Sequence, residues 1–236
     1  MVHGWYTRED ESHYIKEREV SRMDVEVNMN ILDLFAGLGG EQRREYIEGL
    51  GYTYTTLDID PRFGCDITAD VMGVELGMYD FIWASPPCET WSVSSIGHHW
   101  NIDNTPKTKE AEFGIELIKR TIELVNGHSK IGWVIENPRG KLRKMPFMQD
   151  FRRKTVTYCR YGENRMKPTD LWICGFDWEP RLMCKNGDPC HVSAPRGSRT
   201  GTQGMGTYAE KSVVPLELWK EILDAVKDES HLSCPW

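Results

Sequence analysis

Short apolar segments alternate with helical patterns along most of this chain, and this alternation constrains the fold more than any other feature. The apolar segments predict strands at residues 30–35, 52–59, 79–84, 131–135 and 171–174. The periodic segments predict helices at residues 41–50, 109–126 and 216–226. Strands that alternate with helices are typical of parallel sheets. We therefore predict an α/β fold with a doubly wound, mostly parallel sheet whose ligands bind at the carboxyl ends of the strands.

The length of 236 residues fits one α/β core with a small appendage. Residues 175–211 contain a long stretch rich in Gly, Pro, Ser and Arg, which predicts a small irregular insert. We expect four parts, namely an N-terminal arm or docked helix (1–29), a core (30–174), the insert (175–211) and a C-terminal segment that returns to the core (212–236).

Composition narrows the class of protein. Hydrophobic residues make up 39% of the chain, which is enough to form a core. Every apolar run is too short to cross a bilayer, and the first residues do not resemble a signal peptide, so we expect a soluble, cytoplasmic protein without a membrane partner. The seven cysteines lack the spacing of a disulfide scaffold, which favours free thiols with catalytic or metal-binding roles.

Charge is distributed unevenly along the chain. The formal net charge is −7, yet residues 139–167 contain ten basic and two acidic residues, and so carry +8 while the rest carries −15. Such a block is either a surface for a polyanion or an ordinary solvated surface. If it binds DNA, the first candidates are Arg139, Lys141 and Arg143.

A glycine-rich turn follows the first predicted strand, at residues 35–40. Such a turn lets the backbone approach a ligand, and the next helix offers free N–H groups. Gln42 occupies the third glycine position of the dinucleotide fingerprint, which argues against a dehydrogenase. Asp58 ends the second strand, where a ribose-binding acid would lie, and Asp66 follows; each alternatively caps a turn. Together these features favour an adenosyl ligand.

Two further strand ends carry reactive groups. Cys88 follows Pro86 and Pro87, which restrict the loop and suit a rigidly held nucleophile, although a structural cysteine is the alternative. Glu136 ends the next strand and should face the same crevice, unless it is a solvent-facing loop acid. A carboxylate between apolar walls can hydrogen-bond a ring nitrogen and an exocyclic amine.

These motifs resemble those of the cytosine-C5 DNA methyltransferases. Residues 33–40 resemble the family's first motif, Asp58 and residues 66–68 its second and third, Pro87-Cys88 its nucleophile motif, and Glu136-Asn137 its Glu-Asn motif. They occur in the family's order, and residues 212–215 look like its closing motif.

The resemblance implies a Rossmann-like, S-adenosylmethionine-dependent methyltransferase fold and transfer of a methyl group to C5 of a flipped cytosine in double-stranded DNA. Cys88 would add to C6, and Glu136 would hold the N3 and N4 edge of the ring. The family's Gln-x-Arg-x-Arg motif aligns with Arg165 and Lys167, and in this alignment Thr169 replaces one arginine. The implied cofactor-binding residues are Asp33, Phe35, Gly37, Gly39, Asp58, Ile59, Asp66, Ile67, Pro86, Ser212 and Val213.

The sequence departs from the family in its recognition region, because only residues 175–211 are available to read DNA. We therefore expect short or relaxed sequence specificity. Arg196, Arg199 and Gln203 lie on a flexible stretch suited to DNA contacts, unless it is an ordinary loop. The closing motif has Lys211 where the family has Asn. The compact size resembles prokaryotic and phage members, and no obligatory protein partner is evident.

The insert also contains candidate zinc ligands, namely Cys174, Cys184, Cys190 and His191. A structural metal would benefit a small irregular segment, although no Cys-x-x-Cys pair is present and scattered thiols are the alternative.

Three rival functions stay open at this stage. An amino-group methyltransferase acting on N4 of cytosine or N6 of adenine has a similar Pro-Pro loop but an aromatic residue in place of Cys88. A catalytically silent DNA-binding relative would explain Thr169 and Lys211. The same thiol chemistry on RNA or a free nucleotide would suit the small recognition region.

Overall fold

The computed structural model describes residues 28–195 and 201–227, and its centre is a seven-stranded sheet in the order β3-β2-β1-β4-β5-β7-β6. The strands are β1 (Asn30–Leu34), β2 (Thr53–Asp58), β3 (Ile67–Thr68), β4 (Tyr79–Ala84), β5 (Ser129–Pro138), β6 (Arg152–Thr157) and β7 (Pro168–Cys174). All pairings from β3 to β5 are parallel, whereas β7 runs antiparallel to both β5 and β6. The prediction of a doubly wound, mostly parallel sheet is confirmed, and strands β3-β2-β1-β4-β5 follow the Rossmann order.

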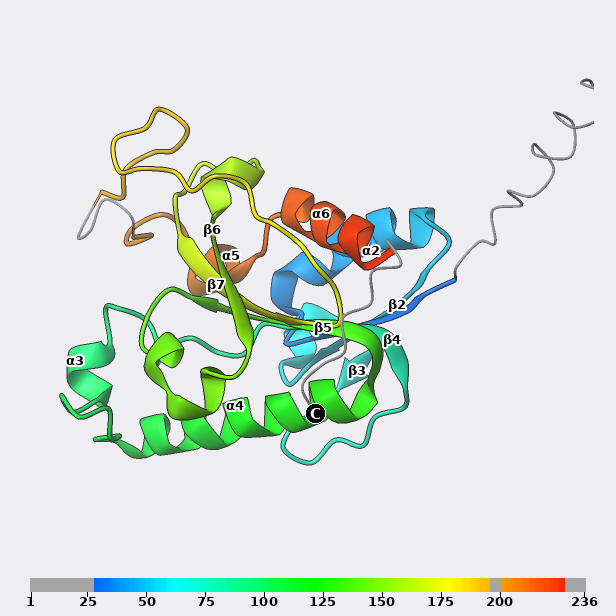
Figure 1. Cartoon of the computed structure of the whole chain (residues 1–236), viewed down its shortest axis with the longest axis horizontal. Helices are drawn as coiled ribbons and strands as arrows, with labels where there is room; N and C mark the ends of the chain where they lie inside the picture. Colours follow the sequence, from blue (N-terminus) through cyan, green and yellow to red (C-terminus); the bar gives the residue numbers. More distant parts are fainter. Residues whose placement is uncertain (1–27, 196–200, 228–236) are drawn as a thin grey trace, which may run out of the picture.

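Helices cover both faces of this sheet. Figure 1 shows α4 (Lys109–His128) along one face, while α2 (Gly40–Gly49) and α6 (Leu216–Lys227) cover the other. The shorter helices are α3 (Ile96–His99), α5 (Tyr208–Ser212) and the 3₁₀ turns η1 (Gly37–Gly39), η2 (Pro61–Phe63), η3 (Leu142–Lys144), η4 (Pro146–Met148) and η5 (Tyr158–Tyr161). Among the described helices, none has both the length and the apolar character needed to span a bilayer.

Helix α4 shows how the sequence sets a boundary. Thr108 is its N-cap, and the threonine side chain accepts a hydrogen bond from the Ala111 backbone N–H. From there an apolar stripe that includes Ile118 and Leu124 is fully buried against the sheet, in the cluster that also holds Trp133. The predicted helix at residues 109–126 is thus found, two residues longer than expected.

The opposite face is closed by the C-terminal segment. Trp219 of α6 stacks on Trp83 of β4 with ring centroids 4.3 Å apart, and Leu218 and Ile222 are fully buried beside it. An apolar stripe of this kind accounts for the docking of α6 on the sheet. Helix α6 packs on the sheet as far as residue 227, and of the predicted N-terminal arm (1–29) only residues 28 and 29 lie within the described part.

Strand β6 was not predicted. Its residues, Arg152–Thr157, are rich in basic side chains and fall inside the basic block. They form the edge of the sheet, and Arg152 and Lys154 pair with Asp177 and Glu179. Charged side chains are a common feature of edge strands, because they discourage pairing with other chains.

Candidate active site

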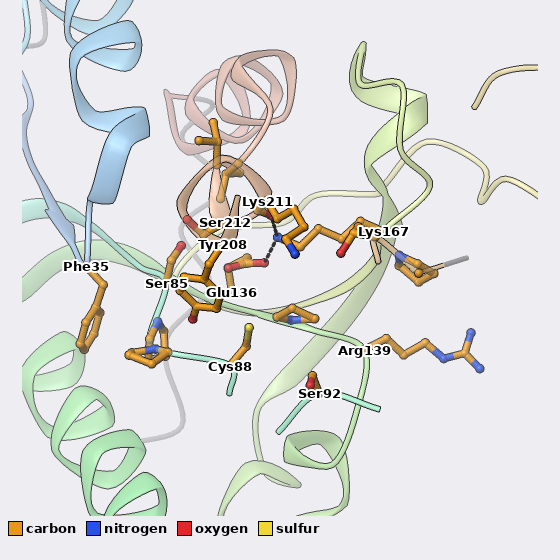
Figure 2. A pocket seen from close by; sticks show the side chains of 18 of the residues that line it. Phe35, Ser85, Cys88, Ser92, Glu136, Arg139, Lys167, Tyr208, Lys211 and Ser212 are labelled. Carbon is orange, nitrogen blue, oxygen red and sulfur yellow. Dashed lines mark hydrogen bonds and ion pairs between the residues drawn. The ribbon is translucent and has the colours of Figure 1, made fainter. Parts of the chain in front are cut away.

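A cavity of about 800 Å³ opens at the carboxyl ends of β1, β4 and β5. Its walls come from the loops that follow these strands, from the residues before β7 and from α5, as Figure 2 shows for ten labelled side chains. This is the position at which ligands bind in doubly wound sheets, and the volume suits a small organic ligand. Cys88 and Glu136, which the sequence placed at consecutive strand ends, both line it.

The loop that carries Cys88 is held at two points. Ser85 N–H donates to the Leu34 carbonyl of β1 at 3.1 Å. Asn137 of β5 donates from Nδ2 to the Pro86 carbonyl at 3.0 Å, and this asparagine is fully buried. Together with the restriction from Pro86 and Pro87, these bonds fix the backbone from which the thiol projects. Asn137 is therefore a positioning residue. The sequence marked it as part of the Glu-Asn motif but assigned it no role.

Glu136 is buried and engaged on one side. Its Oε1 accepts a hydrogen bond from the Tyr158 hydroxyl at 2.8 Å and lies 4.0 Å from Lys167 Nζ. Both contacts are made to Oε1, so within the described part of the chain Oε2 has no hydrogen bond of its own. A carboxylate that is 3% exposed, lines the cavity and keeps one oxygen unengaged is suited to accept hydrogen bonds from a ligand.

The charges around Cys88 act on its thiol in opposite directions. Burial raises the pKa of Cys88, and Glu136 raises it further, whereas Lys167 and the Tyr208 hydroxyl lower it. Burial likewise lowers the pKa of Lys167, while Glu136 and Cys88 raise it. The three groups therefore form one electrostatic unit, in which Lys167 is the group that favours the thiolate.

Two buried cations join this unit to α5. Lys167 Nζ donates to the Lys211 carbonyl at 2.9 Å, and Arg165 donates to the carbonyls of Glu210 and Val213, each at 2.8 Å. Lys167 adopts a φ of +30°, which is strained for a residue with a side chain. Both cations thus hold α5 over the cavity. Arg165 does not itself line the cavity, so it can affect the cavity only through α5.

Thr169 stands where the family motif has its second arginine, and it has a structural contact there. It is fully buried in β7, and its hydroxyl donates to the Lys167 carbonyl. Arg165 and Lys167, on the loop before β7, are buried as well.

The glycine-rich turn forms the other end of the cavity. Phe35 lines it with a φ of +61°, and a Cβ built on Gly37 would lie 4.0 Å from Ser212 Oγ of α5. Pro86, Ser212 and Val213 line the same cavity. Gly37, Gly39, Asp58, Ile59 and Ile67 lie at or beside the ends of β1, β2 and β3, outside the cavity lining.

Three predicted cofactor-binding acids, Asp33, Asp66 and Asp58, are engaged by neighbouring residues of the chain. Asp33 is buried, pairs with Arg43 at 2.6 Å and accepts a hydrogen bond from Tyr54 at 2.5 Å. Arg43 in turn donates to the Ala36 carbonyl at 2.7 Å, so Asp33 supports the glycine-rich turn from behind. Asp66 lies outside the cavity lining, and its Oδ2 accepts from Arg44 and from the backbone and hydroxyl of Thr56. Asp58 accepts from Gly37 N–H at 3.1 Å, which orients the turn.

The candidate DNA-binding residues separate into two groups. Arg139 and Gln203 are exposed at the rim of the cavity. Lys141 is instead buried against Trp100 and donates to Asn104, and Arg143 is paired with Asp170, so neither is available as predicted. Arg196 and Arg199 lie outside the described residues.

Most of the basic block is neutralised by acids. Six of its ten cations form ion pairs, namely Arg143, Arg152, Lys154, Arg160, Arg165 and Lys167. Their partners include Asp170, Asp177, Glu179 and Asp188, which lie up to 28 residues away in sequence. The block is therefore largely an internal ion-pair network, and its exposed cations without an acidic partner among the described residues are Arg139, Lys144 and Arg153.

The predicted metal-ligand set also needs one correction. Cys184, Cys190 and His191 do lie together, but the fourth member is Cys159 rather than Cys174. Cys174 is in β7 opposite Trp133 of β5, and its sulfur is in a disulfide bond, so it is not available as a metal ligand.

Sequence reasoning missed several residues of the site. Tyr158 binds Glu136, and Tyr208 faces Cys88 from α5 (Figure 2). The Thr207–Glu210 pair forms a capping box, a local pattern from which α5 was predictable. Nothing local marks Tyr158, because its partner is 22 residues away.

Comparisons with known proteins give one informative relative. No protein-family model matches the chain. A curated protein of Frog virus 3 (isolate Goorha), named "Probable DNA (cytosine-5)-methyltransferase", is 28% identical over 220 residues, covering 83% of this chain and 99% of that protein. The resemblance to the cytosine-C5 DNA methyltransferases is thereby confirmed.

Solved structures are more distant. The N-terminal domain of human METTL16 in complex with SAH is 11% identical, covers 73% of this chain and 72% of that chain, and has a TM-score of 0.38. A methyltransferase subunit of a type I restriction-modification system from Streptococcus thermophilus is 17% identical, covers 95% and 52%, and has a TM-score of 0.38. Similarity this low carries no information on the substrate of this chain.

Proposed function

We propose that this chain is a DNA (cytosine-5)-methyltransferase that uses S-adenosylmethionine and a covalent adduct between Cys88 and the target cytosine. The observation that carries the proposal is the convergence of Cys88, Glu136 and Lys167 on one cavity at the carboxyl edge of the sheet. The viral relative supports the reaction class.

Cys88 supplies the nucleophile in this proposal. Cytosine C5 is a weak nucleophile, and addition of the Cys88 thiolate to C6 moves the electrons of the 5,6 double bond toward C5. After C5 accepts the methyl group, it loses its proton to a base, and the bond between C6 and sulfur breaks. This restores the double bond and releases the thiolate.

Glu136 and Lys167 support that addition from the other side of the ring. The Glu136 oxygen that no described residue engages can accept a hydrogen bond from the exocyclic amine, and, when protonated, the carboxyl group can donate to N3. Lys167, beside Glu136, favours the thiolate of Cys88 and stabilises negative charge that develops during addition.

The glycine-rich end of the cavity fits S-adenosylmethionine, which supplies an electrophilic methyl group when bound. A Cβ on Gly37 would meet only Ser212 Oγ, at 4.0 Å, so the glycine leaves space for a ligand. The Phe35 ring and Ser212 line this end of the cavity and suit a ligand that has both an apolar and a polar part. Phe35, Pro86, Ser212 and Val213 would hold it, with Asp58 orienting the turn.

Duplex DNA would reach the cavity at its open rim. Arg139 and Gln203 are exposed there, and the cytosine must leave the base stack to reach Cys88. With few side chains available to contact base edges, we propose short or relaxed sequence specificity.

The direct test is transfer of a tritiated methyl group from S-adenosylmethionine to duplex DNA, RNA and dCMP by the full chain. We expect label in duplex DNA as 5-methylcytosine, and loss of transfer by at least about 1,000-fold in Cys88→Ser. Cys65→Ser, a free thiol outside the cavity lining, is the matched control and should retain transfer.

Each rival function predicts a different result. Full transfer by Cys88→Ser, with the label on an amino group, would establish an amino-group methyltransferase. DNA binding without any transfer by the unaltered chain would establish a silent binding protein. Transfer confined to RNA or dCMP would replace the substrate class while leaving the thiol mechanism in place.

A further inference from the structure

Three cysteines and one histidine gather outside the cavity, on the insert and the end of the sheet. Cys159 belongs to η5, directly after β6, while Cys184, Cys190 and His191 belong to the irregular segment after β7. Figure 1 shows this segment in yellow beside the end of β6. Their four ligand atoms all lie within 4.8 Å of one another.

Among four separations between these atoms, three are close to those around a single tetrahedral ion, and the one between Cys184 Sγ and Cys190 Sγ is shorter. Cys184 Sγ and Cys190 Sγ are 3.1 Å apart, and Cys190 Sγ and Cys159 Sγ are 3.7 Å apart. His191 Nδ1 lies 3.3 Å from Cys184 Sγ and 3.8 Å from Cys190 Sγ. Around zinc, with bonds of about 2.3 Å to sulfur and about 2.0 Å to nitrogen, the corresponding separations are about 3.8 Å and about 3.6 Å.

The local backbone explains how ligands close in sequence reach one point. Gly187 has a φ of +96° and lies within the turn closed by the bond from Asp188 N–H to the Lys185 carbonyl. This turn folds the chain back, so that Cys190 approaches Cys184. The adjacent residues Cys190 and His191 therefore both lie close to Cys184 Sγ.

Phe176 and Trp178, at the start of the segment, are buried in the core, but residues 182–192, which carry three of the ligands, are held mainly by polar contacts and the Arg160–Asp188 ion pair. Leu182 is 89% exposed and Val192 is 60% exposed, so burial of apolar side chains contributes little there. Its anchors to the core are single polar contacts, including Cys184 N–H to Thr157 Oγ1 at 2.9 Å and Val192 N–H to the Asn164 carbonyl at 2.7 Å. A small irregular segment without a core is the kind that a structural metal stabilises.

We propose that Cys159, Cys184, Cys190 and His191 bind one structural zinc ion that fastens the insert to the end of β6. Three thiolates and one imidazole fill all four positions of a closed structural site and favour a soft divalent metal over magnesium or calcium. Met166 connects this site with the cavity, because its side chain packs against Cys159 and Cys184 and also lines the cavity beside Lys167.

Metal analysis of the purified full chain tests the proposal. We expect about one zinc per chain after desalting, and cobalt loaded in its place should give the intense absorption of thiolate ligands in tetrahedral geometry. Loss of one ligand in Cys184→Ser or Cys159→Ser should weaken zinc affinity by more than about 100-fold, since even outer-sphere changes cost 10- to 100-fold. A competing chelator of known affinity measures this change.

Two controls keep the test independent of folding and of methyl transfer. Cys65→Ser removes a thiol outside the cluster and should retain one zinc per chain. His191→Cys preserves four ligands, so it should still bind cobalt but with stronger thiolate absorption. A chain that contains no zinc, fails to bind cobalt, or forms a Cys184–Cys190 disulfide when purified without oxygen would overturn the proposal.

Discussion

At the scale of single residues, the site depends on a thiol and two charges of opposite sign. Burial keeps the pKa of Cys88 above its ordinary value, and Lys167 and Glu136 pull that pKa in opposite directions. The reactivity of Cys88 toward an alkylating reagent follows its thiolate fraction, so it should increase with pH and reach half its maximum above the ordinary thiol pKa.

Changing the two charges should move this midpoint in opposite directions. Lys167→Met removes the cation and should raise the pKa of Cys88, whereas Glu136→Gln removes the anion and should lower it. Alkylation rates measured across pH, with the modified cysteine identified by mass spectrometry, test both. If both substitutions shift the pKa of Cys88 in the same direction, or leave it unchanged, the opposing effects of Lys167 and Glu136 are contradicted.

A single substitution also tests the structural role of Asp33 as the partner of Arg43. Asp33→Asn leaves the buried Arg43 without a counter-charge and should lower the free energy of unfolding by about 3–5 kcal/mol. Asp224→Asn, in an exposed pair with Lys227, should change it by less than about 1 kcal/mol. Urea unfolding measures both, and equal effects would contradict the structural role of Asp33.

At the scale of elements, α5 is a short helix that closes the cavity. It is held by its capping box and by the bonds from Arg165 and Lys167 to its carbonyls. Five residues are too few for a helix to persist alone, so these contacts determine whether Tyr208 and Ser212 face the cavity.

Removing the cap should therefore weaken cofactor binding. Thr207→Ala costs about 1 kcal/mol of helix stability, which should raise the dissociation constant for S-adenosylmethionine by about fivefold. Thr108→Ala removes the N-cap of α4, outside the cavity lining, and should leave that constant unchanged. Calorimetric titration of the folded variants gives both values. An unchanged constant in Thr207→Ala would show that α5 does not close the site.

The elements also show what sequence can predict. Strand ends with short-range signals, such as the glycine-rich turn, Pro87-Cys88 and Glu136-Asn137, were predicted correctly to lie at one edge of the sheet. Strand β6 was missed because its residues are largely charged rather than apolar. Cys159 was missed because it is distant from Cys184 in the sequence and only the folded chain brings the two together. Contacts between distant residues, such as Arg143 with Asp170, leave no local pattern.

At the scale of the whole molecule, the charge pattern predicts modest electrostatic binding to DNA. Three cations of the basic block are exposed and lack an acidic partner among the described residues, namely Arg139, Lys144 and Arg153. The slope of log affinity against log salt should therefore be about −3, whereas ten available cations would give about −9. Arg139→Ala should reduce the slope by about one. A slope near −9 would show that the ion pairs open on binding.

Covalent trapping of a modified substrate is the sharpest test for an adduct on Cys88. A duplex with 5-fluorocytosine at the target cytosine blocks the loss of the C5 substituent, so the adduct should accumulate in the presence of S-adenosylmethionine and resist denaturation. Mass spectrometry should then place the modified nucleotide on Cys88. If duplex substrates are methylated at C5 yet no adduct forms, or if the adduct maps to another residue, the account of this cavity is wrong.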